Sequence, residues 1–95
     1  MEKKNAYREK IQTQIKEWES MISDLQARGE KATASAKVEI KSAVEKLQSE
    51  KKDLQKRLAE MMSSGGEAWD KLKDGTEKAV ADMKNAIDKA MTKFK

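Results

Sequence analysis

The chain has 95 residues, of which 40% are charged and 4% aromatic, and it contains neither proline nor cysteine. This length allows one domain, and the excess of good helix formers is typical of long helices or a coiled coil and not of a globule with a large core. The net charge of +4 comes from 21 basic and 17 acidic residues interleaved along the chain. A nucleic-acid interface needs basic residues gathered on one face, so we expect no nucleic-acid partner.

The residue types that support most catalytic chemistry are missing. Histidine is absent along with cysteine, which excludes the common zinc sites and the usual catalytic triads. Carboxylates such as Glu17 and Glu19 do not share a helix face. We therefore predict a non-enzymatic protein with no cofactor, no metal and no small-molecule substrate. The first ten residues lack the apolar segment of a signal peptide, so we expect a cytoplasmic protein.

The first predicted element is a long amphipathic helix from about residue 2 to residue 62. Its apolar residues recur in steps of four and three, which places them on one helix face. The first part of this face consists of Ile11, Ile15, Trp18, Ile22 and Leu25, and it continues through Gly29, Ala32, Ala36, Ile40, Ala43, Leu47, Leu54, Leu58 and Met61. A lone glycine costs a helix about 1 kcal/mol relative to alanine. The residues on both sides of Gly29 favour helix, so the sequence favours one continuous helix, with a break at Gly29 as the alternative.

A turn is predicted at residues 63–66, where two serines precede two glycines. Its central residues are Ser64, Gly65 and Gly66. Ser64 and Glu67 also fit the S-x-x-E pattern of a capping box, which would begin the next helix. The second helix is therefore expected from about residue 67 to residue 93.

The second helix has an apolar face that repeats every 11 residues, a spacing that keeps such a face nearly straight along the helix. The face consists of Trp69, Leu72, Val80, Met83, Ile87, Met91 and Phe94. Lysines at positions 73, 84 and 95 border it on one side. Lysines beside a wide apolar face suit the rim of a helix bundle and also a helix lying on a lipid surface, so we predict a face for helix packing or for lipid.

The lengths of the two predicted helices do not match. A second helix of about 28 residues spans roughly 42 Å and covers the first only back to about Ala36. Residues 1–35 would then overhang with an apolar stripe. Either the first helix breaks at Gly29 and a three-helix bundle forms, or the stripe packs on a second molecule. The sequence favours the second solution, with Ile11, Ile15, Trp18, Ile22 and Leu25 as the self-association interface.

Residues 63–95 resemble the C-terminal part of a family of small bacterial coiled-coil stress-response proteins. The family pattern is a glycine-containing turn, A-W-x-x-L-K-x-G, an A-x-x-x-(L/M)-K repeat and a terminal K-F. It is matched here by Ala68, Trp69, Leu72, Lys73, Gly75, Ala79, Met83, Lys84, Phe94 and Lys95. The run of Trp18, Ile22 and Leu25 is similar to the N-terminal half of the family. The 11-residue repeats also look like those of apolipoproteins and dehydration-protectant proteins. The resemblance implies a stress-linked helical protein and supplies no catalytic residue.

The sequence therefore predicts an all-α single domain over residues 1–95, folded as a long helical hairpin or antiparallel coiled coil. Its expected function is that of a structural or interaction protein that self-associates through amphipathic helices as a dimer or larger oligomer, or that binds partner helices. The alternative is a protein that binds a membrane surface through residues 67–95.

Overall fold

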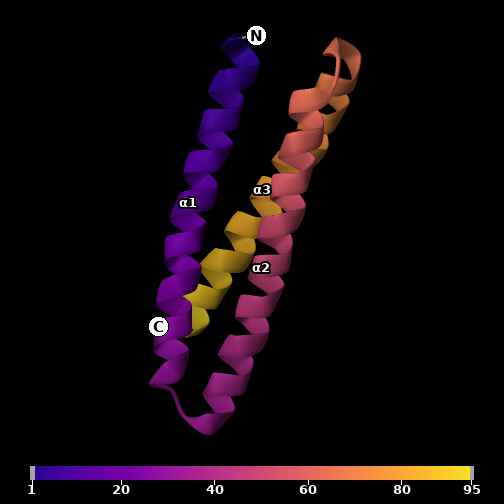
Figure 1. The fold of residues 1–95 in the computed structure, drawn as a ribbon. Coiled ribbons are helices and arrows are strands. Elements are labelled where there is room, and N and C mark those ends of the chain that lie inside the picture. Colours follow the sequence, from indigo (N-terminus) through magenta and orange to yellow (C-terminus); the bar gives the residue numbers. More distant parts are fainter. Residues whose placement is uncertain (1, 95) are drawn as a thin grey trace.

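Three α-helices form the computed structural model, which describes residues 2–94. They are α1 (Glu2–Glu30), α2 (Ala34–Ser63) and α3 (Gly66–Lys93). The chain reverses at each turn, so α1 and α3 run in one direction and α2 in the other (Figure 1). The bundle measures 50 × 18 × 17 Å. The predicted all-α class is confirmed. Lys95, which belongs to the lysine border and to the family pattern, lies outside the described residues.

The chain turns at residues 31–33, so the predicted continuous helix over residues 2–62 is wrong and the three-helix alternative is observed. The break does not fall on Gly29, which is still helical, but directly after the end of α1. Thr33 has an extended backbone, with φ −63° and ψ 162°, and its hydroxyl oxygen accepts a hydrogen bond from the Ala36 amide at 3.4 Å. Thr33 is therefore the N-cap of α2. We refer to residues 31–33 as the hinge.

Burial explains why a helix-favouring segment breaks. A straight helix would leave the apolar side chains before Gly29 in water, and burying each large aliphatic one contributes about 1.5–3 kcal/mol. Several such side chains outweigh the few backbone hydrogen bonds lost at the hinge, each worth about 1 kcal/mol. Gly29 provides the space for this reversal: a Cβ atom there would lie 2.9 Å from Cγ2 of Ile40. The glycine thus serves close packing of α1 on α2.

One hydrophobic core runs along the whole bundle. On α2 the buried side chains include Val44, where the sequence had indicated Ala43. The row of core-facing positions on α2, which we call the seam, then contains Lys51 and becomes apolar again at Leu54. The buried apolar residues are Tyr7, Ile11, Ile15, Trp18, Ile22, Leu25, Ile40, Val44, Leu47, Leu54, Leu58, Met61, Met83, Ile87 and Ala90. All three helices contribute, so the core joins them into one unit.

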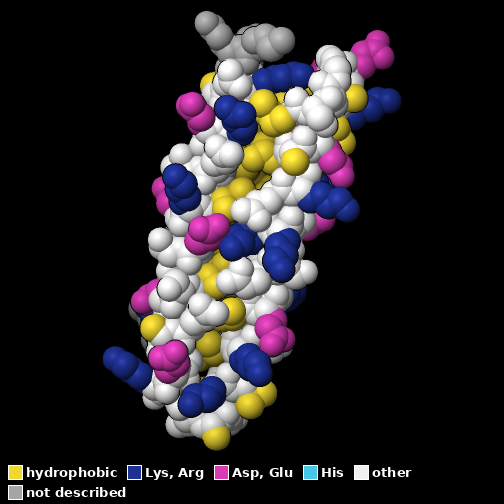
Figure 2. Space-filling model, viewed as in Figure 1, with side chains coloured by type: hydrophobic (Ala, Val, Ile, Leu, Met, Phe, Trp, Pro, Cys, Tyr) yellow, Lys and Arg dark blue, Asp and Glu magenta, His cyan; other side chains and the backbone are white. Residues whose placement is uncertain are grey.

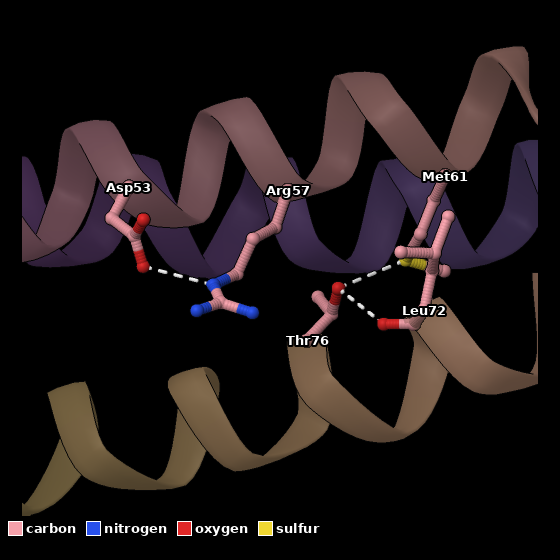
Figure 3. A network of polar contacts seen from close by, with 5 residues as sticks. All are labelled: Asp53, Arg57, Met61, Leu72 and Thr76. Carbon is pink, nitrogen blue, oxygen red and sulfur yellow. Dashed lines mark hydrogen bonds and ion pairs between the residues drawn. The ribbon is translucent and has the colours of Figure 1, made fainter.

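A small polar network joins α2 to α3 inside this core (Figure 3). The hydroxyl of Thr76, which is fully buried, donates to the Leu72 carbonyl oxygen at 2.9 Å and lies 3.0 Å from the sulfur of Met61. The helix itself therefore satisfies the one buried hydroxyl of α3. Nearby, Arg57 pairs with Asp53 at 2.9 Å, and its guanidinium group lies 3.4 Å from where a Cβ of Gly75 would be.

The second turn lies where it was expected, but its capping differs. Gly65 is the N-cap of α3 and offers no side-chain hydrogen bond, so the predicted capping box of Ser64 with Glu67 is wrong. The Ser64 hydroxyl instead donates to the Met61 carbonyl oxygen at 2.7 Å, and Ser64 is the C-cap of α2. Gly66 is the first residue of α3. The serine that seemed to start one helix therefore ends the previous one.

Candidate helix-association surface

The α1 stripe, meaning Ile11, Ile15, Trp18, Ile22 and Leu25, is the residue set that the sequence assigned to self-association. In the structure these five side chains are between 1% and 6% exposed and form part of the core. The predicted overhang does not exist, because α1 is matched in length by α2 and α3. In the closed bundle the α1 stripe contacts the chain's own helices and offers no surface to another molecule.

One ion pair within the seam sets how α1 lies along α2. Lys51 occupies a core-facing position of α2, its side chain is only 17% exposed, and its ammonium nitrogen lies 3.4 Å from the Glu19 carboxylate. A polar residue in an apolar seam specifies register, because any slip would leave its charge buried without a partner. The pair therefore favours this alignment of α1 on α2 over shifted ones.

Two cationic side chains of α1 bind the carboxyl-terminal ends of the other helices. The Lys4 ammonium donates to the carbonyl oxygen of Ser64, the C-cap of α2, at 2.8 Å. The Arg28 guanidinium donates to the carbonyl oxygen of Phe94, the C-cap of α3, at 3.3 Å. Carbonyls at a helix C-terminus lack partners within the helix and carry partial negative charge, so cations stabilise them. In this way α1 caps both α2 and α3.

An aromatic cluster joins the beginning of α1 to the beginning of α3. The rings of Tyr7 and Trp69 meet edge to face with centroids 5.7 Å apart. The ammonium of Lys4 lies 5.2 Å from the Trp69 ring centroid, and that of Lys73 lies 5.4 Å from the Tyr7 centroid. Burial raises the pKa of the Tyr7 hydroxyl, and the negative charge of Glu77 raises it further. Among the described residues, no group forms a hydrogen bond of ordinary geometry with this buried hydroxyl.

Replacing Tyr7 with phenylalanine should therefore stabilise the bundle by about 1 kcal/mol at neutral pH, because a buried hydroxyl without a partner is removed. This difference in stability should grow above pH 10, because the ordinary pKa of tyrosine is 10.0. Above that pH the unfolded parent chain loses the Tyr7 hydroxyl proton while the folded chain keeps it, which destabilises the parent and not the phenylalanine variant. Urea unfolding of both proteins across this pH range measures the difference between their free energies of unfolding. The titration of the lysines largely cancels in this difference, because both proteins contain the same lysines. A gain that shrank with rising pH would contradict the assignment.

An open groove borders α1. It has a volume of about 880 Å³ and lies between α1 and α2, lined by the core side chains of Ile15 and Leu58, by Met62, and by the polar chains of Arg8 and Gln12. Figure 2 shows hydrophobic side chains along the furrow between these helices. Contact between α1 and α3 is the least extensive of the three helix pairs. Helix α1 therefore packs mainly on α2, along this open groove.

The face of α3 that was predicted for helix packing or lipid is used inside the bundle. Met83 and Ile87 are 1% exposed. The other five residues of the face are partly buried against the same core: Trp69, Leu72, Val80, Met91 and Phe94. Helix packing is therefore the use that the structure shows, and the aromatic rings at the two ends of α3 retain some exposure.

Sequence reasoning missed two parts of this surface: Lys51 and Val44. The spacing of the seam could have shown the position of Lys51, which falls between Leu47 and Leu54, but its pairing with Glu19 is a contact between helices. Across residues 2–94 no helix is long and apolar enough to cross a membrane, and no group of three or more ligand-type side chains could hold a metal ion.

No protein-family model, curated protein or solved structure matches this chain. The resemblance to bacterial stress-response proteins therefore stays a prediction.

Proposed function

We propose that the protein is a non-enzymatic helix-association module, which acts by releasing α1 from its own bundle and packing the exposed apolar stripes against helices of another molecule. The observation that carries this proposal is the position of α1: it has the smallest contact with α3 and borders the open groove against α2. Its apolar side chains recur in steps of three and four residues, the spacing of a helix that packs against a partner helix.

The polar contacts that hold α1 support its role as the exchangeable helix. The Glu19–Lys51 pair and the Arg28 bond to the Phe94 carbonyl involve side chains that are partly exposed. Partly exposed charge pairs contribute little net stability, about 1 kcal/mol or less each. They orient α1 without fixing it strongly, and a second helix with the same pattern could take the same place.

The test adds a fluorescently labelled peptide of residues 2–30 to the unlabelled full chain and follows its anisotropy. The peptide should enter the bundle in place of α1, raising anisotropy to a plateau and becoming helical. The matched control peptide carries Ile11→Lys and Ile22→Lys, which place charges where the side chains are 1% exposed, and it should not bind. If neither peptide binds, even after refolding together with the chain from urea, the proposal fails.

A second candidate function, binding to an anionic membrane surface, is favoured by the two ends of α3. Trp69 and Phe94 are partly exposed, and the ammoniums of Lys4 and Lys93 lie 5.2 Å and 5.4 Å from their ring centroids. Aromatic rings beside lysines are typical of residues at a lipid headgroup layer. With Trp18→Phe, Trp69 is the remaining tryptophan of two, and its emission should shift to the blue on anionic vesicles and not on neutral ones. An unchanged spectrum removes this candidate.

The resemblance implies a role in a stress response, which is compatible with either function and stays a prediction.

A further inference from the structure

The hinge has the properties of a segment that can become helix. It has three residues, Lys31, Ala32 and Thr33, and separates two helices of 29 and 30 residues. No described residue has a positive φ, and the chain has no proline. The extended ψ of Thr33, at 162°, is what turns the chain. Rotation of a few backbone angles at the hinge would therefore join α1 and α2 into one helix of roughly 90 Å.

The apolar seam stays on one face when the hinge is straightened. The buried or partly buried positions across it are Leu25, Gly29, Ala32, Ala36 and Ile40. Their spacing of three and four residues keeps them on one side of a continuous helix. The middle three are small, so a partner helix could approach closely at this point. A joined helix would present an apolar face that continues across the hinge.

The register of α1 on α2 also fits a symmetric pair of such helices. Glu19 and its partner Lys51 are each 16 residues from Ser35. Gly29 and Ile40, which touch beside the turn, are six and five residues from it. Two straightened copies running antiparallel with their Ser35 residues opposite each other would therefore place Glu19 of one copy opposite Lys51 of the other, and Gly29 within one residue of Ile40. A two-fold axis at Ser35 satisfies both copies at once.

We propose that a second copy of this chain is the partner of α1, through a domain-swapped dimer in which the hinge becomes helical. The α1 stripe of each copy packs on α2 and α3 of the other, with the Glu19–Lys51 pair formed between copies. This inference rests on the proposed helix-association function and names its partner. Closed monomer and swapped dimer share the same core contacts, so the hinge and the protein concentration decide between them.

Two neighbouring exposed residues allow the hinge to be biased in opposite directions without touching the core. Thr33→Ala removes the N-cap of α2 in the closed form and favours a continuous helix, so the association constant should rise about tenfold per hinge and about 100-fold for the dimer. Ala34→Pro puts proline at the first residue of α2, where it is tolerated after an extended residue. Inside a continuous helix it should lower association by about 10⁴-fold.

The control is Gly66→Pro, which puts proline at the first residue of α3, where a Cβ would meet nothing within 4 Å. It should leave association unchanged, whereas it would block an exchange through the turn at Ser64 and Gly65. All four proteins are refolded from urea at millimolar concentration and analysed by sedimentation equilibrium. A spin label on Ser35→Cys, the sole cysteine of that variant, should give one short distance between copies in the dimer.

The swap is supported if the association constant is highest for Thr33→Ala, equal for the parent and Gly66→Pro, and lowest for Ala34→Pro. Equal dimerisation of Ala34→Pro and the parent overturns it, as does loss of the dimer in Gly66→Pro alone or a monomer in every variant. These failures differ from failure of the proposed function: a monomeric Ala34→Pro chain that still takes up the peptide of residues 2–30 would keep helix association and remove only the second copy as its partner.

Discussion

Replacing Ile22 with alanine should lower the free energy of unfolding by about 3 kcal/mol, a large part of the total stability of a domain of this size. Ile22 is 1% exposed, in the middle of the α1 stripe. The change removes buried methyl groups and leaves a cavity between the helices. Urea unfolding followed by circular dichroism, at concentrations where the parent is monomeric, measures the loss, and the midpoint should not depend on protein concentration.

The neighbouring residue supplies the control. Met21 is 39% exposed on the same helix turn, so Met21→Ala should change the stability by less than about 0.5 kcal/mol. If Ile22→Ala left the monomer as stable as Met21→Ala but weakened an oligomer, the α1 stripe would be an interface between molecules and its burial within the chain would be refuted.

Replacing Met83 with lysine should destabilise the bundle by about 3–5 kcal/mol, because an ammonium without a partner would be placed in the core. Met83 is 1% exposed and lies on α3 facing the other helices. The loss should appear as a lower melting temperature, with the tryptophan emission of the variant shifted to the red at temperatures where the parent is still folded.

Ala81→Lys is the matched change on α3. Ala81 is exposed, and lysine is a good helix former, so this variant should melt close to the parent. Equal stability of Met83→Lys and Ala81→Lys would mean that the apolar face of α3 is free for another surface, such as lipid, and not packed in a bundle.

The fold class could be predicted because it depends on local pattern. Helix-forming composition and apolar steps of three and four residues identified the helical segments and nearly all of the core face, although α1 and α2 were predicted as one helix, and the serine–glycine pair located the second turn. The predicted core face of α2 was wrong at one position: Val44 is buried where Ala43 had been indicated. Both residues are apolar and adjacent, so the sequence pattern does not decide which of them faces the partner helix.

The first turn could not be predicted because no residue at the hinge requires it. Lys31 and Ala32 favour helix, and Thr33 becomes a cap only once the chain has turned. The break is imposed by burial of the α1 stripe against α2 and α3. These contacts join residues far apart in sequence, so a short stretch of sequence does not reveal their energy. Gly29 attracted attention as a helix breaker, while its observed role is to let Ile40 approach.

The candidate surface was predicted in its residues and not in its use. The α1 stripe and the α3 face were each correctly identified as apolar helix faces. The overhang that assigned the α1 stripe to a second molecule was wrong, because it followed from the predicted helix lengths. Once the hinge bends, the two faces cover each other. Two features depend on contacts between helices, so the sequence alone could not have shown them. They are the pairing of Lys51 with Glu19 and the unpartnered hydroxyl of Tyr7.

The capping of α2 and α3 by α1 has a consequence for the order in which a ribosome makes the chain. Arg28 is 66 residues ahead of Phe94, whose carbonyl it binds, and Lys4 is 60 residues ahead of Ser64. The helix synthesised first therefore meets its last acceptor only when residue 94 has left the exit tunnel. The bond of Lys4 to Ser64 can form earlier, so α1 caps α2 before it caps α3.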